Sequence, residues 1–320
     1  MRVAAVDLGT NTTRLLVADV RDGRVEELAR RTAITRLGEG VDERRRLLPL
    51  PIARVRNVLS EYRRQAEELG AERTLAIATS AIRDAENGEA FLGEVEWSYG
   101  FATRLLSGHD EAMLTFRGVT SGRTLERETL IVDIGGGSTE LVAGGPDGVR
   151  FHDSLDVGAV RLTERFLPSD PPVERELAQC ASAVQSLLAK RVPEEVRREA
   201  QEVIGVAGTI TTIAALDLGL AEYDRERVEG YRISRDGIAE QLRRLAAIPL
   251  AERRKVPALE PERAPVIVGG AIILRELLEH FDLAEIEATE HDILDGAALA
   301  AAELPEAEEG AAPPGAYTCC

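Results

Sequence analysis

VDLGTNTTRL at residues 6–15 and VDIGGGSTEL at residues 132–141 are near-copies of one ten-residue pattern. In each copy an apolar run ends in an aspartate, Asp7 or Asp133, followed two residues later by glycine, a short turn of small residues and a second apolar run. Glycine and small polar residues let backbone N–H groups approach an anion closely. The pattern predicts two phosphate-binding β-hairpins, one in each half of the chain, that close on one ligand.

Strand and helix patterns alternate along the rest of the chain. Apolar runs at residues 3–6, 15–20 and 25–28 predict three successive strands, and apolar residues at helical spacing predict a helix over 52–69. The same order of strands and helices returns from residue 129. The alternation predicts an α/β fold of two related lobes with a cleft between them, and ligands of such sheets bind at the carboxyl ends of strands.

Composition limits the classes of function. The 320 residues carry a net charge of −17, which repels nucleic acids at long range. Among 39 basic residues only Lys190 and Lys255 are lysines, and arginine binds phosphate in a bidentate manner. No apolar run approaches the roughly 20 residues of a membrane helix, and the first residues lack a secretory leader. We expect a cytoplasmic protein that binds neither nucleic acid nor membrane and meets anions through a local site.

The three cysteines predict neither a disulfide framework nor a metal site. Cys180 falls in a predicted helix, whereas Cys319 and Cys320 are adjacent at the end of a tail rich in Glu, Ala, Gly and Pro. This composition predicts a disordered tail over residues 304–320.

Five motifs in order carry a resemblance to a known family. They are VDLGTNTTRL, ATSAIRDAEN (residues 78–87), LSGHDEA (106–112), VDIGGGSTEL and DVGAVRLTERF (156–166). Together they resemble the exopolyphosphatase/guanosine pentaphosphate phosphohydrolase (Ppx/GppA) family. The resemblance implies two duplicated ribonuclease H-like lobes of the actin, hexokinase and Hsp70 type, with an interdomain cleft. The implied lobes are residues 1–122, completed by a C-terminal helix at about 292–303, and residues 123–291.

The resemblance also implies an activity. It is hydrolysis of a terminal phosphoanhydride by water with the help of Mg²⁺, or of Mn²⁺, on inorganic polyphosphate or guanosine pentaphosphate. Two alternatives stay open: a catalytically weak polyphosphate or alarmone sensor, and a nucleoside-triphosphate phosphohydrolase. The family further implies a homodimer. Long members carry an added helical domain that this chain lacks, which predicts a preference for short polyphosphates or nucleotide tetra- and pentaphosphates.

Carboxylates carry the implied chemistry. The resemblance assigns Glu111 as the general base, or as the residue that orients the attacking water, and Glu140 as a second catalytic carboxylate. Asp7, Asp133 and Glu140 are the expected Mg²⁺-side acids. For an isolated Glu111 the alternative is a solvated acid at a helix start. Arg14 in the first hairpin aligns with Glu140 in the second, so the copies have diverged in chemistry.

Backbone donors of both hairpin turns are expected to hold the phosphates. They belong to Gly9, Thr10, Asn11, Thr12, Gly135, Gly136, Gly137, Ser138 and Thr139. Arg83, after the TSA turn, is the first choice for a direct contact to the phosphate chain, and Arg14 and Arg161 are secondary candidates.

A nucleotide or distal site is the last expectation. VAGTITT, with a predicted turn at Gly208 and Thr209, and GGAIILREL, with Gly269 and Gly270, match regions that contact base and ribose in kinases of this fold. Tight helix–strand packing explains these glycines equally well.

Overall fold

The chain forms two compact units. The computed structural model describes residues 1–305. One unit comprises Met1–Arg123 together with the chain from Ile293 onward, and the other comprises Thr124–Asp292. The expectations for Cys319, Cys320 and almost all of the tail at 304–320 lie outside the described residues.

The first unit is built on a five-stranded mixed sheet. Its strands are β1 (Arg2–Leu8), β2 (Thr12–Arg21), β3 (Arg24–Ile34), β4 (Arg73–Ala78) and β5 (Ala102–Leu105). Their order is β3-β2-β1-β4-β5, with β1 to β3 antiparallel and β4 and β5 parallel to β1. Its helices are α1 (Val41–Arg44), α2 (Pro49–Glu68), α3 (Ser80–Arg83), α4 (Gly88–Tyr99), α5 (Gly108–Thr120) and α14 (Ile293–Ala302).

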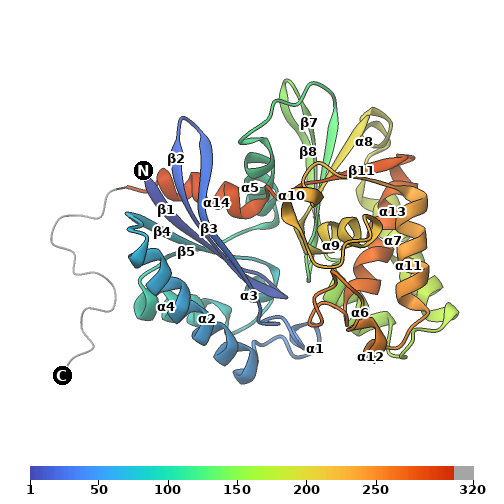
Figure 1. The fold of residues 1–320 in the computed structure, drawn as a ribbon, viewed down its shortest axis with the longest axis horizontal. Helices are drawn as coiled ribbons and strands as arrows, with labels where there is room; N and C mark the ends of the chain where they lie inside the picture. Colours follow the sequence, from blue (N-terminus) through green and yellow to red (C-terminus); the bar gives the residue numbers. More distant parts are fainter. Residues whose placement is uncertain (306–320) are drawn as a thin grey trace. The chain divides into compact units, whose positions relative to one another are not determined.

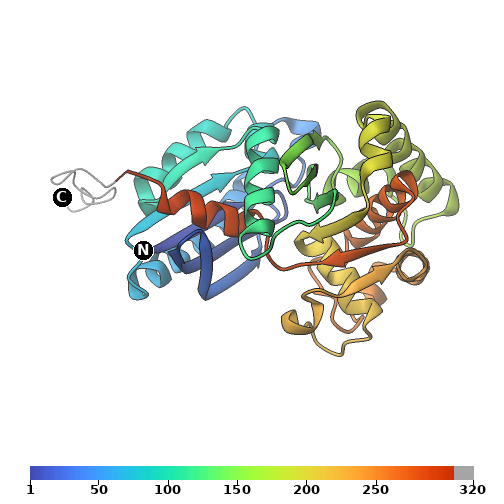
Figure 2. The same cartoon turned by 90° about the horizontal axis from the view of Figure 1, so that it is seen from above.

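Helices pack on both faces of this sheet, which makes the unit a three-layer α/β/α structure. In β1, Val3 and Ala5 join an apolar cluster with α5 and α14, whereas Ala4, Val6 and Leu8 join a second cluster with α2 and α4. Figure 1 shows these two pairs of helices on opposite sides of the sheet. This alternation is the period of two that a strand imposes on its side chains. Seen from above, α14 lies beside α5 (Figure 2).

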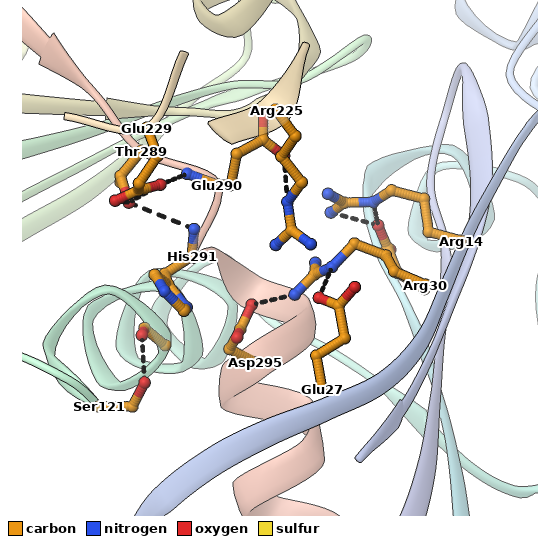
Figure 3. Close-up of polar contacts among 12 residues, drawn as sticks. Arg14, Glu27, Arg30, Ser121, Arg225, Glu229, Thr289, Glu290, His291 and Asp295 are labelled. Atoms are coloured by element: carbon orange, nitrogen blue, oxygen red, sulfur yellow. Dashed lines mark hydrogen bonds and ion pairs between the residues drawn. The ribbon is translucent and has the colours of Figure 1, made fainter. Parts of the chain in front are cut away.

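Helix α14 is far from the other elements of this unit in the sequence. It is tied to β3 by Arg30, whose Nη2 contacts Oδ2 of the buried Asp295 at 2.8 Å (Figure 3). Arg73 on β4 donates to the carbonyl of Ala302 at the other end of the helix, at 2.7 Å. These contacts, with the apolar side chains of α14, complete the core of the first unit.

The second unit is built on a six-stranded sheet. Its strands are β6 (Thr129–Ile134), β7 (Thr139–Gly145), β8 (Gly148–Leu155), β9 (Glu202–Val206), β10 (Arg232–Ser234) and β11 (Glu285–Ala288). Its helices are α6 (Ala159–Phe166), α7 (Glu174–Arg191), α8 (Glu194–Glu199), α9 (Ala207–Asp217), α10 (Arg225–Val228), α11 (Arg235–Ala246), α12 (Leu250–Arg253) and α13 (Ile267–Phe281). The segment after β11 is fixed by Glu229, which accepts hydrogen bonds from the Thr289 hydroxyl and the Glu290 amide (Figure 3).

The two sheets repeat one topology. The second has the order β8-β7-β6-β9-β11, which matches β3-β2-β1-β4-β5 and is extended by β10. This is the strand order of the ribonuclease H-like fold, and the predicted α/β class with two duplicated lobes is confirmed. Leu130, Val132 and Ile134 of β6 face the core of this unit, so Asp133 lies on the opposite face of the sheet.

Two local predictions differ from the structure. Gly208 and Thr209 do not form a turn, because they belong to the first turn of α9. The edge strand β10 is absent from the predicted elements, since its three residues are polar at both ends.

Within residues 1–305, no helix combines the length and apolar character needed to cross a bilayer.

Candidate active site

The turn of the first hairpin is held open by backbone contacts. Its first bond runs from the Gly9 amide to the Thr12 carbonyl at 2.9 Å. The Thr10 carbonyl accepts from the Gly38 amide at 2.8 Å, and the Asn11 carbonyl accepts from two amides of the segment after β3, at 3.1 and 2.9 Å. A trans peptide directs its N–H opposite to its C=O. The amides of Asn11 and Thr12 therefore point away from that segment, as a phosphate-binding turn requires.

The turn of the second hairpin is held by α6. The Gly135 amide donates to the Ser138 carbonyl at 3.0 Å, which is the counterpart of the Gly9–Thr12 bond. The Gly135 and Gly136 carbonyls accept from the first amides of α6 at 2.9 to 3.1 Å. The Gly137 carbonyl accepts from Nε of Arg161 at 2.8 Å. By the same peptide geometry, the amides of Gly136, Gly137 and Ser138 point away from α6.

These three amides are among those predicted to bind phosphate. None of them has a hydrogen-bond acceptor among residues 1–305. Helix α6 approaches so closely that a Cβ on Gly158 would lie 2.5 Å from the Gly136 carbonyl. Arg161, a secondary candidate for a phosphate contact, bonds to the loop that contains these amides.

Two threonine hydroxyls, one in each hairpin, make hydrogen bonds within the protein. Thr10 Oγ1 lies 2.9 Å from Oγ of Ser80, at the start of α3. Thr139 Oγ1 donates to the Val157 carbonyl at 2.6 Å and is fully buried. The predicted role of both residues thus concerns their backbone amides, and the hydroxyls fix the turns to neighbouring elements.

Asp133 and Glu140 are a pair of opposed carboxylates. They are direct partners in the antiparallel register of β6 and β7, so their side chains lie on the same face of the sheet. Their exposed fractions are 6% and 1%. Ser154, opposite Glu140 on β8, donates its hydroxyl to Oε1 of Glu140 at 2.8 Å. Two like charges in such positions repel one another, which favours a bound cation.

The first hairpin has a different arrangement at the same positions. Asp7 is the register partner of Arg14, which donates to Oδ2 of Asp7 from Nε at 3.0 Å and from Nη2 at 2.8 Å (Figure 3). The charge of Asp7 is therefore matched within the protein. Among residues 1–305, no group of three or more His, Cys, Asp or Glu side chains is arranged to hold a metal ion.

Glu111 lies near the start of α5, directly after the capping box that begins this helix. Ser107 and Asp110 exchange the two hydrogen bonds of the box. The hydrogen bond from the Ser107 hydroxyl lowers the pKa of Asp110 below its usual value. Glu111 itself is buried, with 6% of its surface exposed, so the alternative of a solvated helix-start acid is wrong.

Arg83 binds this carboxylate. Its Nη1 lies 3.0 Å from Oε2 of Glu111 and also donates to the Leu106 carbonyl at 2.9 Å. Arg83 therefore orients Glu111 in addition to its predicted contact with phosphate. Asp7 lies on the face of the first sheet that α5 covers, because it alternates with Val3 and Ala5.

Two of the glycines expected at a nucleotide site, Gly269 and Gly270, lie against neighbouring helices. A Cβ on Gly269, in α13, would lie 2.7 Å from Oγ1 of Thr163 in α6. A Cβ on Gly270 would lie 2.6 Å from Cγ2 of Thr209 in α9. Close approach of helices, rather than of helix and strand, accounts for this pair. Gly208 differs, because a Cβ there would meet the end of a flexible side chain, with Nη1 of Arg263 at 2.0 Å.

Sequence reasoning missed Ser80 and Ser154. Both contact predicted site residues through side chains, from elements that are distant in sequence. Finding Ser154 requires the register of β7 and β8, which no local pattern provides. Ser80 lies within the quoted ATSAIRDAEN motif, and that motif was its only signal.

Two ribonuclease H-like lobes of matching strand order place the protein in the fold class of actin, hexokinase and Hsp70. The model of the Ppx/GppA phosphatase family matches residues 16–300, and the chain belongs to this family. It is thus an enzyme of the phosphoanhydride hydrolase class.

Individual relatives agree with the family over nearly the whole chain. Exopolyphosphatase 2 of Mycobacterium tuberculosis is 38% identical over 318 residues, which cover 94% of this chain and 98% of the relative. The crystal structure of an Aquifex aeolicus Ppx/GppA family member has a TM-score of 0.80 at 34% identity, covering 94% of this chain and 97% of that one. The structure of an exopolyphosphatase-like protein reaches 0.87 at 34% identity, with coverage of 92% and 97%.

Proposed function

We propose that this enzyme releases the terminal phosphate of inorganic polyphosphate or of guanosine pentaphosphate by in-line attack of water. The observation that carries the proposal is the pair of buried, opposed carboxylates Asp133 and Glu140, next to three amides that point away from α6. Amides suit the phosphate oxygens, and acids suit the cation or the water. The exopolyphosphatase names of several relatives support the choice of substrate.

The residues of the second unit fit a divalent metal. Asp133 and Glu140 offer hard oxygen donors from directly opposed positions on two neighbouring strands. They would hold Mg²⁺, or Mn²⁺, together with water and phosphate oxygens. A divalent ion held there would supply positive charge that offsets the charge of the phosphoryl group. Ser154 keeps Oε1 of Glu140 in place. In the first unit, Arg14 donates to Oδ2 of Asp7, the other predicted Mg²⁺-side acid.

In the first unit, Glu111 accepts the proton of the attacking water. Burial favours this role because it removes competing solvent, and the hydrogen bond from Arg83 fixes the carboxylate on one side. The amides of Asn11 and Thr12 bind phosphate oxygens in this unit, and the turn of the second hairpin has the same role in its own unit.

A phosphate-release assay tests this function. Tripolyphosphate, long-chain polyphosphate, guanosine pentaphosphate and ATP are each incubated with the protein in the presence of Mg²⁺, Mn²⁺ or EDTA. We expect metal-dependent release from polyphosphate or guanosine pentaphosphate and little from ATP. Binding without release would favour the sensor, and release mainly from ATP would favour the nucleoside-triphosphate phosphohydrolase.

A cytoplasmic location and a homodimer stay predictions.

A further inference from the structure

The first unit contains a basic pocket apart from the two hairpins. Its volume is about 380 Å³, and its lining includes Arg44, Arg46 and Arg56. Arg44 and Arg46 belong to the one run of three consecutive arginines in the chain. We propose that this pocket is a second binding site for a phosphate anion with at least two phosphoryl groups.

The arginines of the pocket differ from most others in the protein. Arg44 and Arg46 are exposed, and neither makes an ion pair or a side-chain hydrogen bond among residues 1–305. Most arginines of this acidic chain contact a carboxylate, as Arg2 contacts Asp19 and Arg63 contacts Glu67. Two guanidinium groups with free donors therefore line one pocket, and phosphate oxygens are their best-matched partners.

Arg56 adds a third guanidinium whose position is fixed. Its Nε and Nη2 donate to the two carboxylate oxygens of Glu94 at 2.6 and 2.7 Å. This fork leaves Nη1 without an acceptor among the described residues. A guanidinium that is already held loses less side-chain entropy when it binds a further anion.

The wall of the pocket contributes positive potential and rigidity. Leu48, Pro49 and Ile52 line it at the start of α2, a helix of 20 residues with no acid in its first turn and no side-chain cap. Such a helix end carries partial positive charge. The side chain of Asn87 holds the backbone of Leu47 by two hydrogen bonds. Its Oδ1 accepts from the Leu47 amide at 2.8 Å, and its Nδ2 donates to the Leu47 carbonyl at 3.1 Å.

The charge arrangement selects a polyphosphate over a single small anion. The net charge of −17 repels any anion at a distance, so binding needs several local contacts at once. Arg44 and Arg46 are separate donors on the pocket rim, and two linked phosphoryl groups can engage both. The apolar side chains of Leu48 and Ile52 would also accommodate a nucleotide base, so the phosphate chain can be inorganic or part of a nucleotide.

The segment that leads to this pocket also holds the first hairpin. Amides of Thr35, Arg36 and Gly38 bond to the carbonyls of Thr10 and Asn11. The chain then passes through α1 directly to Arg44. Binding at the pocket can therefore alter the exchange of amides in residues 9–15, although the proposal of a site does not depend on such coupling.

Hydrogen–deuterium exchange of the full chain in EDTA tests the site without turnover. Tripolyphosphate should slow exchange of peptides within residues 41–56, and ATP tests the nucleotide source in a parallel arm. Protection by tripolyphosphate alone, by ATP alone or by both supports the site and identifies its ligand. No protection of residues 41–56 by either compound, or equal protection by sulfate at the same concentration, overturns it.

Charge-matched variants sharpen this test. The double variant Arg44→Gln with Arg46→Gln should raise the tripolyphosphate concentration that gives half-maximal protection by about tenfold or more, because it removes two charge-assisted contacts. The control Arg24→Gln with Arg45→Gln removes the same net charge from arginines outside the pocket lining, and should change it less than about twofold. Equal losses in both variants would overturn the site. Because the readout is binding, it stands even if the protein hydrolyses none of the proposed substrates.

Discussion

Arg14 donates to Oδ2 of Asp7 from Nε at 3.0 Å and from Nη2 at 2.8 Å. Asp7 and Arg14 are register partners in the first hairpin, and Asp133 and Glu140 occupy the same two positions in the second. The same backbone thus presents an acid–base pair in one unit and two acids in the other. The divergence at this register position, which aligning the two copies predicts, is therefore a difference in side-chain chemistry on the same strand pairing.

Removing Arg14 should destabilise the first unit. Asp7 and Arg14 have side-chain exposures of 6% and 15%, so Arg14→Gln leaves a buried carboxylate without its cation. We expect a loss of about 3–5 kcal/mol in the free energy of unfolding, measured with urea. The double variant with Asp7→Asn should recover most of this loss. A double variant as unstable as the single one would show that charge is not the cause.

Replacing Glu140 should remove the response of stability to metal. Without Mg²⁺, Glu140→Gln relieves the repulsion from Asp133, and we expect a gain of up to about 1 kcal/mol. The melting temperature of the wild type should rise when Mg²⁺ is added, whereas that of the variant should not. Glu202→Gln, on β9, is the control and should keep the rise. An undiminished Mg²⁺ effect in Glu140→Gln would exclude this carboxylate as a ligand.

A methyl group at Gly158 should displace the second phosphate-binding turn. The added Cβ meets the Gly136 carbonyl at 2.5 Å, and backbone atoms cannot move aside cheaply. Gly158→Ala should cost about 1–3 kcal/mol of stability and raise KM for tripolyphosphate. Gly122→Ala, where nothing lies within 4 Å, should change neither quantity. Normal KM in Gly158→Ala would show that the turn does not bind phosphate.

Arg161 should act on binding through the same turn. Arg161→Gln removes the Nε bond to the Gly137 carbonyl and frees that peptide to rotate. We expect KM for tripolyphosphate to rise by about tenfold with a smaller change in kcat, since one charge-assisted bond is lost. Arg165→Gln, an exposed position on the same helix, is the control. A fall in kcat alone would instead indicate contact with the reacting phosphate.

The fold could be predicted well because its signals are local. The strands from residues 3–6, 15–20 and 25–28 were expected from apolar runs and are found within β1, β2 and β3. The divergence of Arg14 from Glu140 was also visible by aligning the two copies. Gly208 and Thr209 were misjudged because a glycine beside a hydroxyl residue resembles a turn, although tertiary packing places them at the start of α9.

The contacts of the predicted site residues could not be read from spacing. Arg83 and Glu111 meet because α3 and α5 follow neighbouring parallel strands, and Glu140 meets Ser154 because of the register of β7 and β8. These pairings depend on sheet order, which no sequence window contains. The role of Arg161 likewise appears only once α6 is seen to approach the glycine turn.

The most direct test of the account is single-turnover hydrolysis of tripolyphosphate by Glu111→Gln with saturating Mg²⁺. Glutamine keeps the acceptor for Arg83 and the size of the side chain but cannot take a proton. We predict a rate lower than that of the wild type by about two to four orders of magnitude, with substrate affinity retained. A rate within a few-fold of the wild type would contradict it and remove Glu111 from the chemistry.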